Sequence, residues 1–151
     1  MPRLSEQILV PHSAENLFEL VRNVRRYPEF INFIESIAVR QEQSGDPLYT
    51  CIGEARVTFK GFEETFSTHV EADSETRKIQ VKLERGPFRH LRNRWQFDPR
   101  GDGHTRIHFF LDYEFRNPIL GLLARTNSRL AIDKIMSAFR GEADRRYTRT
   151  A

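Results

Sequence analysis

Hydrophobic residues occupy alternate positions along most of the chain, a pattern typical of β-strands with one buried side and one solvent-facing side. One alternating segment runs up to Pro11, and further segments follow from about residue 37 onward. Short runs rich in Gly, Pro, Asp and Ser separate the later segments and predict turns between antiparallel neighbours. The predicted strands cover residues 4–10, 37–43, 49–59, 62–72, 79–83, 91–97 and 107–115.

The segment between the first two predicted strands has helical spacing instead. Ser13 is a favourable N-cap for a helix that carries Leu17, Val21 and Val24 on one stripe. Pro28 is expected to interrupt that helix, because proline lacks the backbone donor and its ring clashes with the preceding turn. A second short helix is then expected, with an apolar face made of Phe30, Phe33 and Ile34.

A long C-terminal helix is predicted to begin at Asn117 and Pro118, which combine a capping side chain with a proline at the first helical position. The helix is expected to end near Tyr147, a length of about 45 Å at the usual rise per residue. Its predicted buried stripe consists of Leu120, Leu123, Ile132, Ile135, Phe139 and Ala143.

This order of elements predicts an α+β fold in which residues 1–151 form one domain. A meander of twisted strands followed by one long helix implies a curved antiparallel sheet wrapped around that helix, with two short helices after the first strand. One straight helix cannot fill such a concave sheet along its whole length. The gap is therefore a natural site for an apolar ligand.

Composition narrows the class of protein further. Of the 151 residues, 38% are hydrophobic and 30% are charged, and the 12 Phe residues argue against a disordered chain. No apolar run approaches the ~20 residues of a membrane span, and the first residues lack the pattern of a signal peptide. We therefore expect a cytoplasmic protein, with peripheral contact at the inner membrane as a further expectation.

Metal, disulfide and catalytic chemistry are not expected. Cys51 is the single cysteine, which excludes a disulfide framework and a cysteine-based zinc site. His104 and His108 have the spacing of a helical zinc motif, but at a turn and on a strand they would lie about 13 Å apart. Asp112 and Glu114 share the strand face opposite the apolar stripe and are interpreted as solvated rather than as paired catalytic carboxylates. No phosphate loop, nucleophile elbow or complete triad occurs, so no catalytic residue or cofactor is predicted.

Five short motifs follow one another along nearly the whole chain. They are Tyr27-Pro28-Glu29-Phe30, Gly86-Pro87-Phe88, Trp95-Gln96-Phe97, Tyr113-Glu114-Phe115-Arg116-Asn117-Pro118 and Ile135-Met136-Ser137-Ala138-Phe139. Together they resemble the START-like superfamily of helix-grip lipid carriers and polyketide cyclase-like proteins. Within it the chain is most similar to the coenzyme Q-binding protein family, which includes bacterial ribosome-association toxins. One departure is Ile31-Asn32-Phe33, where family members more often carry Leu-Pro-Trp.

The resemblance implies non-catalytic binding of ubiquinone or a related isoprenoid quinone, in support of respiratory electron transport. For some bacterial members it also implies interference with the joining of ribosomal subunits. A polyketide cyclase-type enzyme is the third hypothesis, disfavoured because no general base is expected to point inward. The candidate ligand-binding residues are Tyr27, Pro28, Phe30, Val57, Phe59, Phe88, Asn93, Trp95, Phe109, Tyr113 and Leu123.

Two groups among these candidates have competing interpretations. The Tyr27–Phe30 motif forms either a rim over the cavity or a plain corner between helices. Phe88 is either a second rim residue or a residue that folds back onto the core. Trp95 and Asn93 are predicted to face inward, where an indole can stack on a quinone ring and a buried amide needs a polar partner. The alternatives are that Trp95 is ordinary core and that Asn93 faces solvent.

The most basic window of the chain holds four arginines and no acid, within residues 85–95: Arg85, Arg89, Arg92 and Arg94. Arg92 and Arg94 have the same strand parity and are predicted to point outward together. Basic residues interleaved with aromatic ones bind RNA or anionic lipid head groups, and a solvated strand edge is the alternative. The partners expected are an isoprenoid quinone, an anionic membrane surface and the ribosome, but not DNA.

Overall fold

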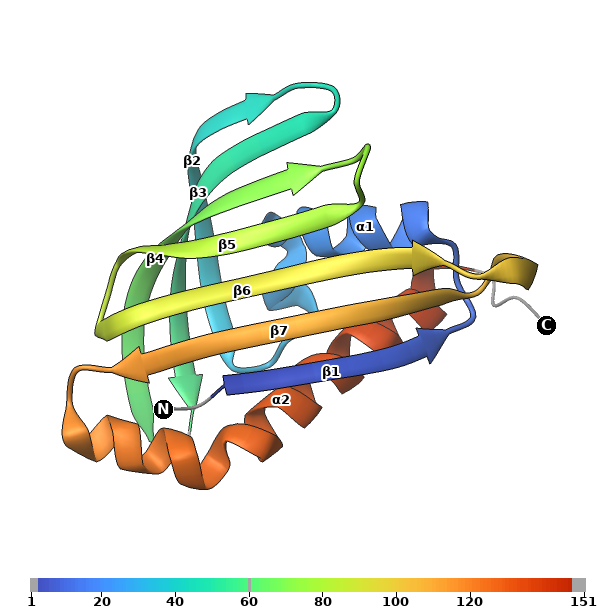
Figure 1. The fold of residues 1–151 in the computed structure, drawn as a ribbon. Coiled ribbons are helices and arrows are strands. Elements are labelled where there is room, and N and C mark those ends of the chain that lie inside the picture. The colour runs from blue at the N-terminus through green and yellow to red at the C-terminus, as the bar shows by residue number, and fades with distance from the viewer. Residues whose placement is uncertain (1–2, 60, 148–151) are drawn as a thin grey trace.

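The computed structural model describes residues 3–59 and 61–147, in which a seven-stranded sheet carries helices on its inner side (Figure 1). The strands are β1 (Arg3–Val10), β2 (Ile34–Ser44), β3 (Leu48–Phe59), β4 (Phe62–Asp73), β5 (Lys78–Arg85), β6 (Phe88–Pro99) and β7 (Thr105–Phe115). The helices are α1 (Ala14–Arg22), the short 3₁₀ helices η1 (Val24–Glu29) and η2 (Gly101–Gly103), and α2 (Pro118–Arg146).

All neighbouring strands of the sheet are antiparallel, in the order β1-β7-β6-β5-β4-β3-β2. The sheet bends around α2, and α1 lies on the same inner side (Figure 1). The predicted α+β helix-grip fold is therefore confirmed, with its curved sheet and long C-terminal helix.

Both predicted helix caps are present. The Ser13 hydroxyl accepts a hydrogen bond of 3.2 Å from the backbone N–H of Asn16. The Asn117 side chain accepts one of 2.8 Å from the N–H of Ile119, and Pro118 occupies the start of α2. Each cap satisfies a donor that the first turn of a helix leaves unpaired.

The prediction for the second short helix was wrong in position and type. Helix α1 ends at Arg22, well before Pro28, and the following helix is the 3₁₀ turn η1, which contains Pro28. The three apolar residues expected on one face of the predicted helix instead contact three different parts of the protein. Phe30 packs edge-on against Phe139 at 5.3 Å, Phe33 packs against Phe59, and Ile34 opens β2 opposite Val57. Helical spacing in so short a segment arose from unrelated tertiary contacts.

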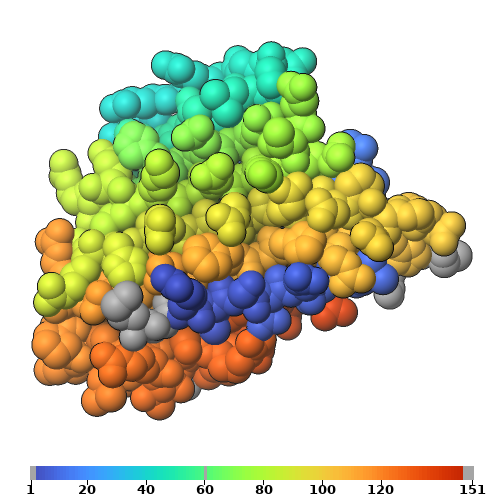
Figure 2. All heavy atoms as spheres, viewed as in Figure 1, coloured from blue at the N-terminus to red at the C-terminus, as the bar shows by residue number. Residues whose placement is uncertain are grey.

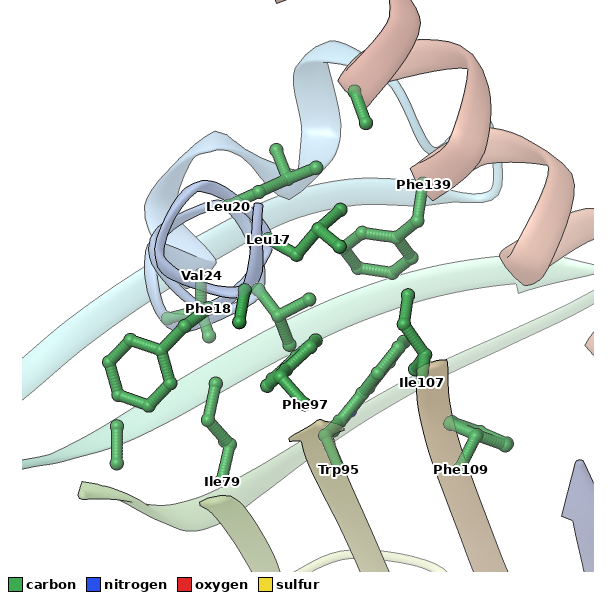
Figure 3. Close-up of a cluster of buried hydrophobic side chains, with 14 of the residues drawn as sticks. Leu17, Phe18, Leu20, Val24, Ile79, Trp95, Phe97, Ile107, Phe109 and Phe139 are labelled. Atoms are coloured by element: carbon green, nitrogen blue, oxygen red, sulfur yellow. The ribbon is translucent and has the colours of Figure 1, made fainter. Parts of the chain in front are cut away.

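The solid core occupies one end of the molecule, where α1 and the second half of α2 lie on the sheet. Leu17, Phe18 and Leu20 of α1 belong to this core with Trp95 and Phe97 of β6, and Phe18 packs edge-on against Phe97 at 6.2 Å (Figure 3). The rings of Trp95 and Phe97 are nearly parallel, with centroids 6.1 Å apart, and Phe97 is fully buried. Because α1 covers only this end, the other end of the concave sheet is left to the first half of α2 alone.

Candidate functional site: a cavity under the start of α2

A partly open cavity of about 240 Å³ lies between the sheet and the first half of α2. Strands β3, β4, β6 and β7 form one wall, and residues 120–135 of α2 form the other. The lining is predominantly apolar. It consists of Phe33, Val57, Phe59, Phe62, Glu64, Phe66, Phe88, Leu91, Leu111, Tyr113, Phe115, Leu120, Leu123, Ala124, Asn127, Ser128, Ala131, Ile132 and Ile135.

Aromatic rings form the end of the cavity nearest the turn between β5 and β6. Phe88 stacks on Phe115 with ring centroids 4.6 Å apart and meets the edge of Phe66 at 5.2 Å. Gly86 lets the turn approach this cluster, because a Cβ at that position would lie 2.5 Å from the Cβ of Phe66. Phe88 is only 6% exposed, so it folds back onto the interior and is not an exposed loop residue.

Tyr113 brings one of the few polar groups into the cavity. Burial raises the pKa of its phenol, which therefore stays protonated at neutral pH. No hydrogen bond to this hydroxyl is formed by any residue that the structure describes. Tyr113 can thus donate a hydrogen bond to a carbonyl oxygen of a bound molecule.

Glu64 also lines the cavity, although no inward-facing base was expected from the sequence. Its position on β4 has the same parity as Phe62 and Phe66, which line the cavity with it. That shared parity was the signal in the sequence that could have placed Glu64 on the inner face. Asn127 and Ser128 of α2 were missed as well, because helix polarity alone does not show how deep a polar residue lies.

The eleven predicted ligand-binding residues fall into two groups. Five of them line the cavity: Val57, Phe59, Phe88, Tyr113 and Leu123. Tyr27, Pro28, Phe30, Asn93, Trp95 and Phe109 lie outside its lining.

Trp95 and Asn93 face inward, as predicted, but they are bonded to each other. The Trp95 indole N–H donates to the Asn93 side-chain oxygen at 2.9 Å, and the Asn93 amide donates to the carbonyl of Phe110 at 2.8 Å. Trp95 also packs between Phe109 and Phe139, at 4.8 and 5.1 Å (Figure 3). These residues belong to the core that borders the cavity.

The predicted rim around Tyr27 lies beside the cavity and not over it. The Tyr27 hydroxyl donates to the carbonyl of Val21, and its ring packs edge-on against Phe139 at 5.2 Å. Burial raises the pKa of Tyr27. Phe30 lines a separate surface groove between residues 30–33 and α2, and Phe33 and Phe59 form walls of both this groove and the cavity.

The four arginines of the basic window are exposed, but strand pairing places acids beside some of them. Asp112 of β7 lies opposite Arg92 and within 3.4 Å of it, and it also contacts His90 at 3.1 Å. The Arg94 guanidinium lies 5.1 Å from the ring centre of Phe110. The outer face of β6 is therefore less cationic than its sequence suggests.

Asp112 corrects another expectation. It is on the outer face of the sheet, as predicted, but only 2% exposed and therefore not solvated. Arg3, His90 and Arg92 cover its carboxylate. Glu114, its neighbour on the same face, lies 3.8 Å from His90 and is half-buried.

Residues 3–59 and 61–147 contain no group of three His, Cys, Asp or Glu placed to hold a metal ion. His108 is instead paired with Asp98 at 2.8 Å. Cys51 is buried, and burial raises the pKa of its thiol, which keeps it protonated and unreactive. Within the same described residues, no helix has the length and apolar character needed to cross a membrane.

A curved sheet that grips a long C-terminal helix over an apolar cavity defines a START-like helix-grip protein. The chain belongs to the family of polyketide cyclase/dehydrase and lipid transport proteins, whose model matches residues 10–140. It is 32% identical over 138 residues to the ribosome association toxin RatA of Escherichia coli (strain K12), covering 91% of this chain and 84% of that protein. It is 26% identical over 134 residues to the mitochondrial coenzyme Q-binding protein coq10 of Schizosaccharomyces pombe, covering 87% and 80%.

Two solved structures share the fold over almost their whole length. The 18 kDa protein CC1736 from Caulobacter crescentus is 32% identical, with a TM-score of 0.80 and coverage of 96% of this chain and 97% of that one. A START superfamily protein from Mycobacterium smegmatis is 21% identical, with a TM-score of 0.81 and coverage of 95% and 97%. The second likeness concerns the fold alone.

Proposed function

We propose that this protein binds an isoprenoid quinone, or a lipid of similar shape, in the cavity under α2 without transforming it chemically. The observation that carries the proposal is the cavity itself, about 240 Å³ with a predominantly apolar lining. An engineered cavity of about 150 Å³ lined by Leu, Ile and Phe binds benzene. The larger volume suits a substituted ring or the first part of an isoprenoid tail, and the open side provides an exit for a longer tail.

The polar groups of the cavity support a quinone over a plain hydrocarbon. A quinone carbonyl accepts hydrogen bonds, and Tyr113 has a protonated hydroxyl without a protein partner among the described residues. The similarity to a protein named for coenzyme Q binding points to the same class of ligand. Trp95 and Asn93 are not assigned to the quinone head group, because the Trp95 indole N–H already donates a hydrogen bond to the Asn93 side-chain oxygen.

Extraction of the purified protein with organic solvent, followed by mass spectrometry, tests the proposal directly. We expect an isoprenoid quinone at substantial occupancy. A short-chain ubiquinone should also bind to the extracted protein in a calorimetric titration. Ala131→Phe, which places a ring in the cavity, should abolish this binding, whereas Ala38→Phe on exposed β2 should not. Trace quinone together with no titration signal would exclude the proposal.

Glu64 makes catalysis testable as well. A cyclase-type reaction that used Glu64 as its base would stop in Glu64→Gln, while ligand binding would persist. We expect that the cavity ligand is recovered unchanged after incubation with the wild-type protein. Conversion of the ligand by wild type but not by Glu64→Gln would replace the carrier proposal with an enzymatic one.

Ribosome association is a second candidate function, favoured by the similarity to RatA over 91% of this chain. Arg92 and Arg94 are exposed on the outer face of β6, away from the cavity lining. We expect Arg92→Glu with Arg94→Glu to reduce co-sedimentation with ribosomal subunits and to leave quinone binding intact. Wild-type protein that does not co-sediment at moderate salt would exclude this candidate.

A further inference from the structure

The first two turns of α2 are apolar on both sides. Residues 118–124 read Pro-Ile-Leu-Gly-Leu-Leu-Ala and contain no charged residue. Leu120 and Leu123 point into the cavity, whereas Ile119 and Leu122 are 67% and 64% exposed. Ile119 and Leu122, with Leu130 further along, are spaced three and eight residues apart and lie on one stripe of the helix. This edge of the molecule is solvent-facing in Figure 2, at the lower left.

Arginines surround this exposed apolar segment. Arg116 precedes it and Arg125 follows it, and both line a surface groove of about 350 Å³ together with Arg89 of β6 and Leu122. None of these three guanidinium groups has an ion-pair partner in the part of the chain that the structure describes. The one acid of the groove, Glu114, lies 3.8 Å from the imidazole of His90.

The groove borders the cavity. Phe115 and Ala124 line both, so the two hollows lie side by side. The arrangement puts exposed aliphatic side chains, unpaired cations and a lipid-sized cavity at one end of the molecule.

We infer that the start of α2, with Arg89, Arg116 and Arg125, is a docking surface for an anionic lipid bilayer. Ile119 and Leu122 enter the region between head groups and acyl chains, and the arginines bind lipid phosphates above it. This chemistry favours a membrane over RNA, because single-stranded RNA is bound by aromatic stacking and the exposed side chains of the stripe are aliphatic. The surface differs from the outer face of β6, where Arg92 lies beside the buried Asp112.

Flotation with lipid vesicles tests the inference. Wild-type protein should bind vesicles of phosphatidylcholine mixed with phosphatidylglycerol at low salt, and bind phosphatidylcholine vesicles far more weakly. Ile119→Ser with Leu122→Ser should weaken binding to the anionic vesicles by about tenfold, as expected from partial burial of two aliphatic side chains. Leu48→Ser is the matched control, because Leu48 is 44% exposed at the other end of the sheet, beside the turn between β2 and β3.

The charge contribution is tested separately. Substitution of Arg89, Arg116 and Arg125 by Gln should weaken binding by about fivefold for each arginine removed, which corresponds to about 1 kcal/mol per arginine near the membrane surface. Arg92→Gln with Arg94→Gln should have little effect. If both variants lost the same vesicle affinity per arginine, the arginines would act only through the overall positive charge of the protein. That result would overturn the inference.

The remaining outcomes are also decisive. A wild-type protein that does not bind anionic vesicles excludes the surface, as does an Ile119/Leu122 variant that binds like wild type. Loss of ribosome binding in the Arg89/Arg116/Arg125 variant, with vesicle binding intact, would assign the arginines to RNA.

The docking surface does not depend on the ligand in the cavity. Ala131→Phe should still bind anionic vesicles, so failure of the quinone proposal would leave this inference standing.

An environment-sensitive fluorophore provides a second measurement of membrane contact in a protein whose apolar stripe is unchanged. A label on Thr126→Cys should shift to the blue on vesicle addition, whereas one on Leu48→Cys should not; Cys51 is buried and does not compete for the label. An unshifted label at position 126 would contradict the inference.

Discussion

The Trp95 indole donates a hydrogen bond of 2.9 Å to the side chain of Asn93, two residues earlier on β6. The Asn93 side-chain amide in turn donates a hydrogen bond of 2.8 Å to the backbone carbonyl of Phe110 on the neighbouring strand. Two polar groups are thereby satisfied within the protein, on the inner face of the sheet between the cavity and the core. Trp95 and Asn93 were candidates for binding a ligand head group, but their polar groups instead bond to each other and to the neighbouring strand.

Asn93→Ala should therefore reduce stability and spare ligand binding. The substitution leaves the Trp95 N–H and the Phe110 carbonyl without this partner, and each orphaned group costs about 1–3 kcal/mol when buried. We expect a loss of at least about 1 kcal/mol in urea unfolding followed by Trp95 fluorescence. Quinone affinity should change by less than about threefold, a difference of under 1 kcal/mol. A large loss of affinity without a loss of stability would assign Asn93 to the ligand site.

Tyr113→Phe should have the opposite effect. It removes only a hydroxyl that has no hydrogen-bond partner among the described residues, so the thermal midpoint should change little. If the hydroxyl donates to a quinone carbonyl, affinity should fall by about two- to tenfold, the usual net contribution of one hydrogen bond. Tyr27→Phe is the matched control, because the Tyr27 hydroxyl is bonded to the carbonyl of Val21 outside the cavity. Equal affinity of wild type and Tyr113→Phe would exclude the hydroxyl from binding.

Gly86→Ala should disturb the cavity from outside its lining. The new Cβ would lie 2.5 Å from the Cβ of Phe66, so the turn or the aromatic cluster has to move. Overpacking of this kind typically costs about 1–3 kcal/mol. We expect reduced stability and weaker quinone binding together. Gly101→Ala is the control, because a Cβ there meets nothing within 4 Å and should leave both properties unchanged.

Asp112 predicts an acid-sensitive contribution to stability. Desolvation raises the pKa of Asp112, but the hydrogen bond and charge of His90, the charge of Arg3 and the hydrogen bond from Arg92 outweigh it and hold the pKa below its ordinary value. A carboxyl group whose pKa is lower in the folded state stabilises the fold fully above its unfolded pKa of about 4. That stabilisation is lost as the pH falls from about 4 through the lower pKa of the folded state.

The measurement is a series of urea unfolding midpoints between neutral pH and about pH 2. Asp112→Asn should be less stable than wild type at neutral pH, and the difference should shrink as the pH falls below about 4. Asp102→Asn, at an exposed turn, should follow the wild-type curve. A difference between wild type and Asp112→Asn that stays constant with pH would show that the charge of Asp112 does not stabilise the fold.

The strand alternation and the two capped helix starts were readable in the sequence because they depend on local periodicity and local hydrogen bonds. Apolar residues at every second position can bury only one face of a strand, so the alternation of β3, β4, β6 and β7 already separates the inner face from the outer one. Ser13 and Asn117 cap donors within a few residues of themselves, and nothing distant is needed to recognise them. The same local logic failed at Phe30, Phe33 and Ile34, where three separate tertiary contacts imitate a helical stripe.

Only the tertiary structure decided which inward residues face a void and which face a core. Tyr113 and Phe109 have the same parity on β7, yet Tyr113 lines the cavity and Phe109 packs against Trp95. The difference is the position of α1, which lies over one end of the concave sheet and leaves the other end to α2. The burial of Asp112 was equally hidden, because the side chains that cover it come from β1 and β6. Periodicity determines the face on which a side chain lies, and the packing of distant elements determines what meets it there.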